Sequence, residues 1–250
     1  VFQFLVDNGF GSQTSSADAL LRSYALQINW RTPKGGRGDI EPADLDSGKD
    51  RPRFDARTRL QLNDARRKLT IPIQAEYANY YHNPSNPAVD SSIRKGRLLT
   101  GADFDIEAFR RDKRGNYWFG DEFGPYLIKT DENGTVLRSE IPLPGVYAPQ
   151  HKDVVAGKVA ANLPSSGGFE GMAINKSETK LYTLLEGRVA GDPEKNRRIN
   201  EFDLATERYT GRSYVYPLDA EGTNIGDMGG VGGRRFIGLG RKGNTAAPAR

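Results

Sequence analysis

The stretch from Gly101 to Pro125, GADFDIEAFRRDKRGNYWFGDEFGP, predicts a strand, a turn and a second strand. Over residues 102–109, apolar and acidic residues alternate, which is the period of a strand with one buried face. Asp112–Gly115 has turn chemistry, with aspartate at its start and glycine where a positive φ is needed. The aromatic run Tyr117–Phe119 forms the returning strand. The hairpin therefore carries carboxylates along its first strand and again just after its second.

The composition predicts a soluble protein built of many short strands. The 250 residues are 36% apolar, mean hydropathy is negative, and no run approaches the ~18–20 apolar residues that span a bilayer. The 29 glycines and 14 prolines are spread along the chain, as in a β fold with many turns. The 36 Lys and Arg residues are mixed with 32 Asp and Glu residues, so the net charge of +4 does not indicate a nucleic-acid site.

The start of the chain and its lack of cysteine bear on its compartment. The first residues, Val1–Val6, predict a strand, with neither an initiator Met nor a basic and then apolar leader. We therefore expect a mature or trimmed product, or the ordered part of something longer. The absence of cysteine rules out disulfides and thiolate metal sites, and it fits an exported bacterial protein as well as a cytosolic one.

Further strands are expected where apolar and β-branched residues lie between turn signals. They are 1–6, 20–30, 126–129, 135–140, 168–174, 180–185, 197–204, 208–216 and 235–239. Asn133-Gly134 predicts a type I′ hairpin turn, and Gly229–Gly233 predicts another turn. Residues 33–96 show little periodicity, so we expect a long insertion or loop there.

Three segments repeat one pattern, an acid on a first strand and a second position reached through a turn. The pairs are Glu107 with Asp121, Glu170 with Glu186, and Asp227 with Gly240. The first acids are 63 (170 − 107) and 57 (227 − 170) residues apart. A period of this size with four strands per unit is typical of a β-propeller blade. We expect one all-β propeller domain over residues 1–250, as an incomplete ring of about 4.4 units, with a β-sandwich or two small β domains as alternatives.

The longest motifs resemble a known family. LTGADFDIEAFRRDKRGNYWFGDEFGPYLIKTDENGTVL, GGFEGMAINKSETKLYTLLEG, NEFDLATERYTG and IGDM are similar to the phytase-like family of bacteria, called "esterase-like activity of phytase". The resemblance runs from LVDNGFGSQTSSADALLRSY near the start to about Arg250. It implies a β-propeller, export to the periplasm or the exterior, and a calcium-dependent phosphoesterase activity. Where the family usually has Leu-Glu-Arg-Asp, this chain has Leu239-Gly240-Arg241-Lys242, which puts a carboxylate there in doubt.

Strand ends of propeller blades meet at one mouth of the central channel, so acids from different blades are expected to converge there. The predicted calcium ligands are Asp7, Glu107, Asp121, Glu170, Glu186 and Asp227, because Ca²⁺ takes 6–8 hard oxygen ligands. Glu122 and Glu170 are the predicted catalytic carboxylates, and Arg188 is expected to hold a phosphate bidentately. The alternative is that such acids are solvated strand ends or turn formers, which does not explain Glu107 and Glu170 in mid-strand.

Three functions remain open at this stage. The first is a calcium-dependent hydrolase of phosphate esters, the second is a calcium-dependent lactonase or carboxylesterase, and the third is a non-catalytic, calcium-stabilised scaffold or binding protein at the cell surface. Gly240 and Lys242 favour the third slightly. The expected ligand is a small phosphorylated or ester substrate, and the sequence indicates neither the substrate nor the oligomeric state.

Overall fold

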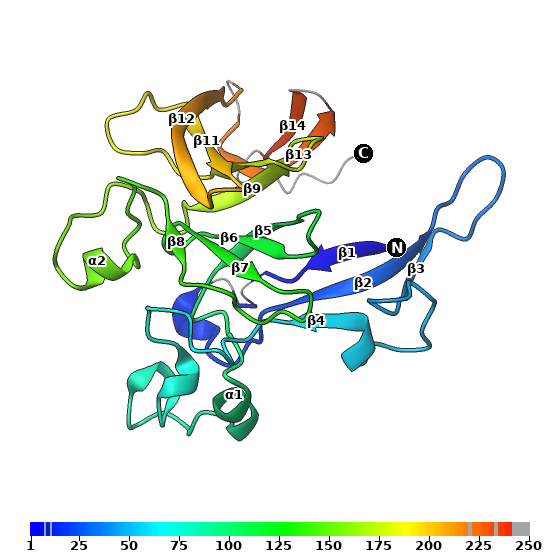
Figure 1. Cartoon of the computed structure of the whole chain (residues 1–250), viewed down its shortest axis with the longest axis horizontal. Coiled ribbons are helices and arrows are strands. Elements are labelled where there is room, and N and C mark those ends of the chain that lie inside the picture. Colours follow the sequence, from blue (N-terminus) through cyan, green and yellow to red (C-terminus); the bar gives the residue numbers. More distant parts are fainter. Residues whose placement is uncertain (8, 11, 220–221, 233–234, 242–250) are drawn as a thin grey trace, which may run out of the picture. The chain divides into compact units, whose positions relative to one another are not determined.

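The computed structural model describes residues 1–7, 9–10, 12–219, 222–232 and 235–241 of the chain (Figure 1). It divides into two compact units, Val1–Phe104 with Thr130–Leu137, and Asp105–Lys129 with Arg138–Arg250. Among the described residues, three of the four sheets have four strands each, with antiparallel pairing, and the helices are few and short. Four-stranded antiparallel sheets are the blades of a β-propeller, and the predicted all-β, propeller-type fold class is confirmed.

The N-terminal unit is built on one sheet with a central strand. The strands are β1 (Phe2–Leu5), β2 (Arg22–Asn29), β3 (Asp39–Pro42) and β4 (Arg59–Gln61). β2 pairs with the other three, and Ile28 lies opposite Ile40 while Arg22 lies opposite Gln61. Residues 33–96, expected as an insertion or loop, thus supply two strands of this sheet. They are too short and polar to show alternation.

The remaining elements of the N-terminal unit are single helical turns and one short helix. They are the 3₁₀ segments Gln13–Ser15, Ala56–Thr58, Gln74–Glu76 and Tyr80–His82, and the helix α1 (Ser91–Gly96). Asp90 caps α1 by accepting the Ser92 amide at 2.7 Å, as expected of an N-cap aspartate. Within the described part of the chain, every helix is too short to cross a lipid bilayer.

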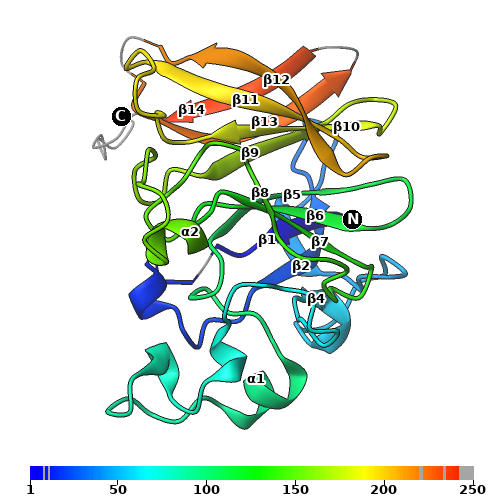
Figure 2. The same cartoon turned by 60° about the vertical axis from the view of Figure 1, so that its left-hand side comes forward.

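The second unit contains three sheets that follow one another along the chain (Figure 2). Its elements are β5 (Ile106–Arg111), β6 (Tyr117–Asp121), β7 (Tyr126–Thr130), β8 (Ile141–Pro142), α2 (Lys152–Val155), β9 (Phe169–Ile174), β10 (Lys180–Leu185), β11 (Asn196–Asp203), β12 (Arg208–Pro217), β13 (Asn224–Gly232) and β14 (Arg235–Arg241). The sheets have the orders β5-β6-β7-β8, β12-β11-β10-β9 and β13-β14. Each sheet is a simple meander, which matches the predicted repeat.

The first strands of the three sheets pack side by side, because β9 contacts both β5 and β13. The core between the sheets is built on aromatic side chains, with Trp118, Phe169 and Phe202 fully buried. A second cluster forms where Leu184 meets Ile225 and Met228. This burial of both faces of a sheet against its neighbours is the packing of propeller blades.

Each first strand carries a one-residue β-bulge at the same place. The ladder of β5 and β6 skips Glu107, that of β9 and β10 skips Glu170, and that of β13 and β14 skips Gly226. A bulge adds one unpaired residue to a strand and redirects its side chain. The repeat is therefore real, but its predicted third member was one residue off, since Gly226 and not Asp227 is equivalent to Glu107 and Glu170.

The predicted hairpin strand at 102–109 begins later than expected. β5 begins at Ile106, and Asp103 and Asp105 are buried instead of lying on a solvated face. Asp103 accepts the backbone amides of Gln74 at 2.7 Å and Thr100 at 2.8 Å. These bonds replace water around the carboxylate, so period-2 alternation alone was misleading here.

Two predicted turns also differ. Asn133 does not have the positive φ that a type I′ turn requires, and only Gly134 is left-handed, at φ 79°. Residues 135–140 do not form a strand, and they pair only through isolated bridges at Thr135 and Val136. The glycines at 229–232 lie inside β13 instead of in a turn, and Gly233 lies outside the described residues.

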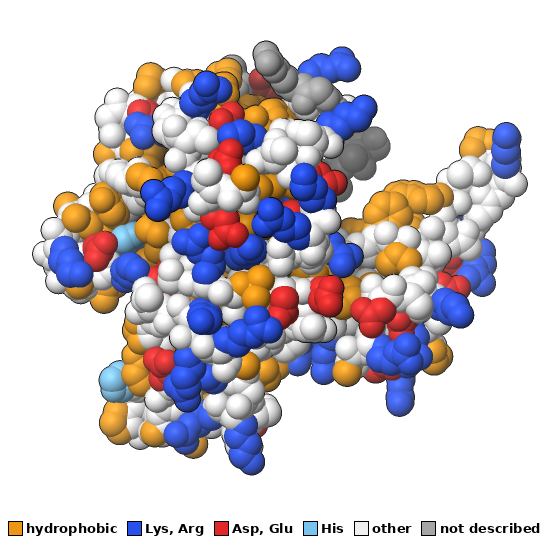
Figure 3. Space-filling view, viewed as in Figure 1, with side chains coloured by type: hydrophobic (Ala, Val, Ile, Leu, Met, Phe, Trp, Pro, Cys, Tyr) orange, Lys and Arg blue, Asp and Glu red, His pale blue; other side chains and the backbone are white. Residues whose placement is uncertain are grey.

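Charged side chains are interspersed on the surface. Figure 3 shows Lys and Arg spread over one face and mixed with Asp and Glu. Ion pairs such as Lys129–Glu207 at 2.6 Å account for part of this mixing.

Candidate functional site: an acidic cluster in the second unit

Two sheets of the second unit place their glutamates in the same way. Glu107 and Glu170 are the bulge residues of β5 and β9, while Glu122 and Glu186 come directly after β6 and β10. The backbone confirms the equivalence, because the Glu122 amide donates to the Asp105 carbonyl at 2.8 Å and the Glu186 amide donates to the Gly168 carbonyl at 2.9 Å. The residue of the first sheet that is equivalent to Glu186 is thus Glu122, and not Asp121 as predicted.

Three of these carboxylates converge on one point. One oxygen from each of Glu107, Glu122 and Glu170 lies within 4.8 Å of the others. Glu122 and Glu170 are 4% and 8% exposed. Oε1 of Glu122 is buried and has no hydrogen-bond partner among the described residues. A buried acceptor without a partner is costly, and carboxylate oxygens at this spacing are of the kind that could hold a cation. We call these three residues the acidic cluster.

The Glu122 carboxyl of the acidic cluster is buried away from water and surrounded by other carboxylates. Burial, and after it the neighbouring carboxylates of Glu186, Asp105, Glu170 and Glu107 in that order, together raise the pKa of Glu122 to about 10. Desolvation and like charges both disfavour the ionised carboxyl. Perturbed acids of this kind concentrate at functional sites.

Gly168 allows the backbone of Glu122 to come close. A Cβ at Gly168 would lie 2.6 Å from the Glu122 carbonyl oxygen and 2.7 Å from its carbonyl carbon. Only glycine tolerates such an approach of two backbone segments. The Gly-Phe-Glu-Gly sequence at 168–171 therefore fixes Glu122 as well as carrying Glu170.

We expect Gly168→Ala to displace Glu122 and lower the free energy of unfolding by about 1–3 kcal/mol, the usual cost of overpacking. Chemical denaturation measures the loss. Gly229→Ala is the matched control, since a Cβ at Gly229 meets nothing within 4 Å. Equal stability of the two variants would contradict the close approach.

Glu186 lies at the wall of a cavity beside the cluster. The Asn224 side chain donates to Oε1 of Glu186 at 2.9 Å, and the Arg197 guanidinium donates to its carbonyl oxygen. The cavity has a volume of about 650 Å³, and its lining includes Ser165, Ser166 and Arg188. Arg188 is exposed, with one weak hydrogen bond to the Asp192 carbonyl at 3.4 Å. The predicted anion-binding arginine thus lines the same cavity as Glu186.

Two of the other predicted ligands, Asp121 and Asp227, have different surroundings. Asp121 is fully buried, and its two oxygens accept the backbone amides of Asp105 at 2.9 Å and Gly124 at 2.7 Å. Asp227 is half exposed and lies 3.7 Å from Arg110. Asp7 follows β1 in the N-terminal unit and is exposed. Gly240 pairs with Ile225 in the third sheet, and Lys242 lies outside the described residues.

Sequence reasoning missed three residues that shape this site. Asp105 raises the pKa of Glu122, Asn224 orients Glu186, and Arg197 anchors the backbone of Glu186. Asp105 was visible as part of the acidic alternation at 102–109. Asn224 and Arg197 gave no signal, because their roles depend on which strand ends lie together.

Comparisons with known proteins give a family and distant relatives. An uncharacterised secreted protein of Arthroderma benhamiae is 29% identical over 178 residues, which covers 58% of this chain and 34% of that protein. This chain therefore spans about a third of the length of that relative. The solved structures of U3-55K and of the RRP9 WD40 repeats each align with 54% of this chain, and with 46% and 45% of their own, at 12% and 11% identity and a TM-score of 0.27.

The match to a protein family covers far more of the chain than the fungal relative or the two solved structures do. The sequence pattern of the family described as "Phytase-like: Esterase-like activity of phytase" matches residues 1–250. The chain belongs to the phytase-like family.

Proposed function

We propose that this protein is a hydrolase of ester bonds that depends on a divalent cation, with phosphate esters as substrates and Ca²⁺ as the cation. The observation that carries the proposal is the convergence of Glu107, Glu122 and Glu170 within 4.8 Å. Two oxygens bound to one Ca²⁺ at about 2.3–2.6 Å lie no more than about 5 Å apart. The family to which the chain belongs supports ester hydrolysis as the reaction class.

The residues present fit a calcium ion. Carboxylates are hard oxygen ligands, and the buried Oε1 of Glu122 lacks a partner among the described residues. Glu107, Glu122 and Glu170 would hold the ion. A bound cation polarises an ester or phosphoryl oxygen and lowers the pKa of a bound water.

The protein's own groups supply the remaining functions. Arg188 binds the substrate phosphate through its guanidinium, which matches phosphate oxygens bidentately. The cavity beside Glu186 holds the substrate, with the hydroxyls of Ser165 and Ser166 on its wall. Glu170 offers one carboxylate oxygen to the ion, and its other oxygen accepts the proton of the attacking water as general base.

We also propose that the protein acts outside the cytoplasm, in the periplasm or the extracellular space. The fungal relative is described as secreted, and a chain without cysteine is stable in either redox environment. Cell fractionation tests this directly.

Turnover of phosphomonoesters, phosphodiesters and inositol phosphates should depend on added Ca²⁺ and be lost after chelation. We expect Glu170→Gln to lower kcat by about 10²-fold or more, the usual contribution of a general base. Arg188→Gln should raise the KM for phosphate esters and leave the KM for carboxylesters unchanged. Glu132→Gln, in an exposed turn, is the matched control.

Three outcomes separate the candidate functions. Turnover of lactones or carboxylesters without phosphatase activity would show that the substrates are carboxylic esters and not phosphate esters. A calcium-dependent rise in Tm without any turnover would identify a calcium-stabilised binding module, which the glycine at the third bulge, Gly226, favours because it adds no ligand. The absence of both turnover and a calcium-dependent rise in Tm would refute the cation site.

A further inference from the structure

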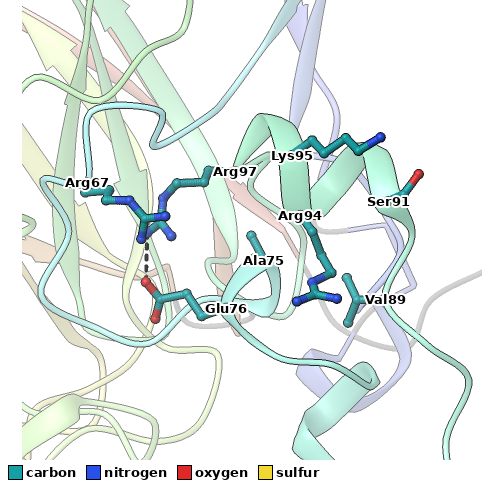
Figure 4. A pocket seen from close by; sticks show the side chains of 8 residues that line it. All are labelled: Arg67, Ala75, Glu76, Val89, Ser91, Arg94, Lys95 and Arg97. Carbon is teal, nitrogen blue, oxygen red and sulfur yellow. Dashed lines mark hydrogen bonds and ion pairs between the residues drawn. The ribbon is translucent and has the colours of Figure 1, made fainter.

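The N-terminal unit contains a second cavity, unrelated to the acidic cluster in its chemistry. It has a volume of about 590 Å³, and four of its lining residues are cations. Figure 4 shows them around Glu76, Ala75 and Val89. The cations are Arg67, Arg94, Lys95 and Arg97. We call this cavity the basic pocket.

One of the four cations already has its counter-charges. Arg97 is buried and lies 3.0 Å from Oδ2 of Asp64 and 2.8 Å from Oε1 of Glu76, and its Nε donates to the Asp64 carbonyl at 2.9 Å. This bonding ties the chain before Arg67 to the 3₁₀ turn at Gln74–Glu76. Arg97 thus forms a fixed part of the wall.

The other three cations have no such partner. Arg67, Arg94 and Lys95 are exposed, and within the described ranges no carboxylate lies within ion-pair distance of them. Arg94 and Lys95 are in the last turn of α1, where cations are favourable in any helix. Arg67 has no such explanation. In Figure 4, Arg94 runs from α1 towards Val89, while Lys95 extends away from Glu76.

The backbone at Arg67 is also unusual. Its φ is 52°, and that of Arg97 is 46°. A left-handed conformation costs a residue with a Cβ roughly 1–2 kcal/mol, which glycine avoids. The turn is closed by the Arg67 amide, which donates to the Asp64 carbonyl at 2.9 Å. An arginine held in a strained position, with no partner for its side chain, indicates a use for that guanidinium.

The floor of the basic pocket is apolar. Ala75 and Val89 are 7% and 5% exposed. A concave surface with an apolar floor and a few convergent charged groups is the usual form of a small-molecule site. The excess of positive charge on its wall selects an anion, and guanidinium groups match the planar oxygens of carboxylates and phosphates.

We propose that the basic pocket binds a small polyanion, a molecule with phosphate or carboxylate oxyanions, through the guanidiniums of Arg67 and Arg94. Arg97 and Glu76 hold the wall in place, and Val89 contacts the body of the ligand. This site requires no cation and no turnover, so it is independent of the ester hydrolysis proposed above.

Isothermal titration calorimetry of the full chain with inorganic phosphate and with citrate, in chelator-treated buffer, tests the proposal. We expect at least one of the two to bind, and the double variant Arg67→Gln/Arg94→Gln to weaken binding by ~10-fold or more, as the loss of two charge-assisted hydrogen bonds predicts. Binding of phosphate but not citrate identifies a phosphorylated ligand, and the reverse identifies a carboxylate.

A control variant decides the interpretation. Arg31→Gln/Arg53→Gln removes the same charge from exposed positions of the same unit outside the pocket lining, and it should bind as the unchanged protein does. The proposal is overturned if neither anion binds, if Arg67→Gln/Arg94→Gln binds as tightly as the unchanged protein, or if the control variant loses affinity equally. Circular dichroism establishes that each variant is folded.

Discussion

Replacing Glu122 by glutamine should abolish the stabilisation of the protein by Ca²⁺. Glutamine keeps the shape of the side chain but cannot ionise, so it cannot present a negative charge to a cation held beside Glu107 and Glu170 in the acidic cluster. Loss of one buried charged partner costs about 3 kcal/mol, which is on the order of 100-fold in the Kd for Ca²⁺. At a Ca²⁺ concentration of 100 Kd the unchanged protein gains about 2.7 kcal/mol, and the variant should gain almost none.

Thermal denaturation with Ca²⁺ and with chelator measures this difference. Without the cation at neutral pH, the variant should be more stable than the unchanged protein, because the raised pKa of Glu122, about 10, makes the folded protein hold a proton that the unfolded chain releases, and glutamine carries no such penalty. Glu132→Gln should keep the full calcium response. A full response in Glu122→Gln would show that Ca²⁺ binds elsewhere.

The second large effect is the pH dependence of stability. Burial and like charges raise the pKa of Glu122 to about 10 in the folded protein, from an ordinary value of 4.5. Between about pH 5 and pH 10 the folded protein therefore holds a proton that the unfolded chain has lost. Its free energy of unfolding should fall as pH rises, by up to about 1.4 kcal/mol per pH unit from this group.

Two other buried acids add to the fall. Burial raises the pKa of Asp121 to about 8 and that of Asp103 to about 7. Ca²⁺ should remove the part due to Glu122, because the bound ion keeps this carboxylate ionised in the folded state, so calcium stabilisation should grow with pH.

Chemical denaturation at pH 6, 7, 8 and 9, with and without Ca²⁺, measures these slopes. Glu122→Gln should flatten the calcium-free slope and leave the contributions of Asp121 and Asp103 in place. An unchanged slope in this variant would contradict the raised pKa of Glu122. A rise in the stability of the calcium-free protein towards pH 9 would also contradict the raised pKa of Glu122.

The sequence predicted the acids of the bulges better than those of the strand ends. Glu107 and Glu170 stood out because an acid in mid-strand, next to a buried Ile or Phe, is neither a solvated strand end nor a turn former. The equivalence of Glu122 with Glu186 was missed, since a bulge shifts the ladder by one residue and leaves no mark in residue type. The same shift made Asp227 look like the third member of the set.

The N-terminal unit was harder to predict for a different reason. β3 and β4 are only four and three residues long, and they form because β2 offers hydrogen-bonding groups on the side opposite β1. Pairing with an existing strand overrides weak local preference. The basic pocket was also invisible, since its cations are dispersed between Arg67 and Arg97 in the sequence.

The bulges also bear on how such a protein can change during evolution. The extra residue of a bulge takes no part in the ladder, so its side chain can be exchanged without disturbing strand pairing. The three sheets of the second unit already hold glutamate, glutamate and glycine at this position. A single codon per sheet would therefore be enough to add or remove a negative group, which allows new chemistry to be acquired on an inherited scaffold.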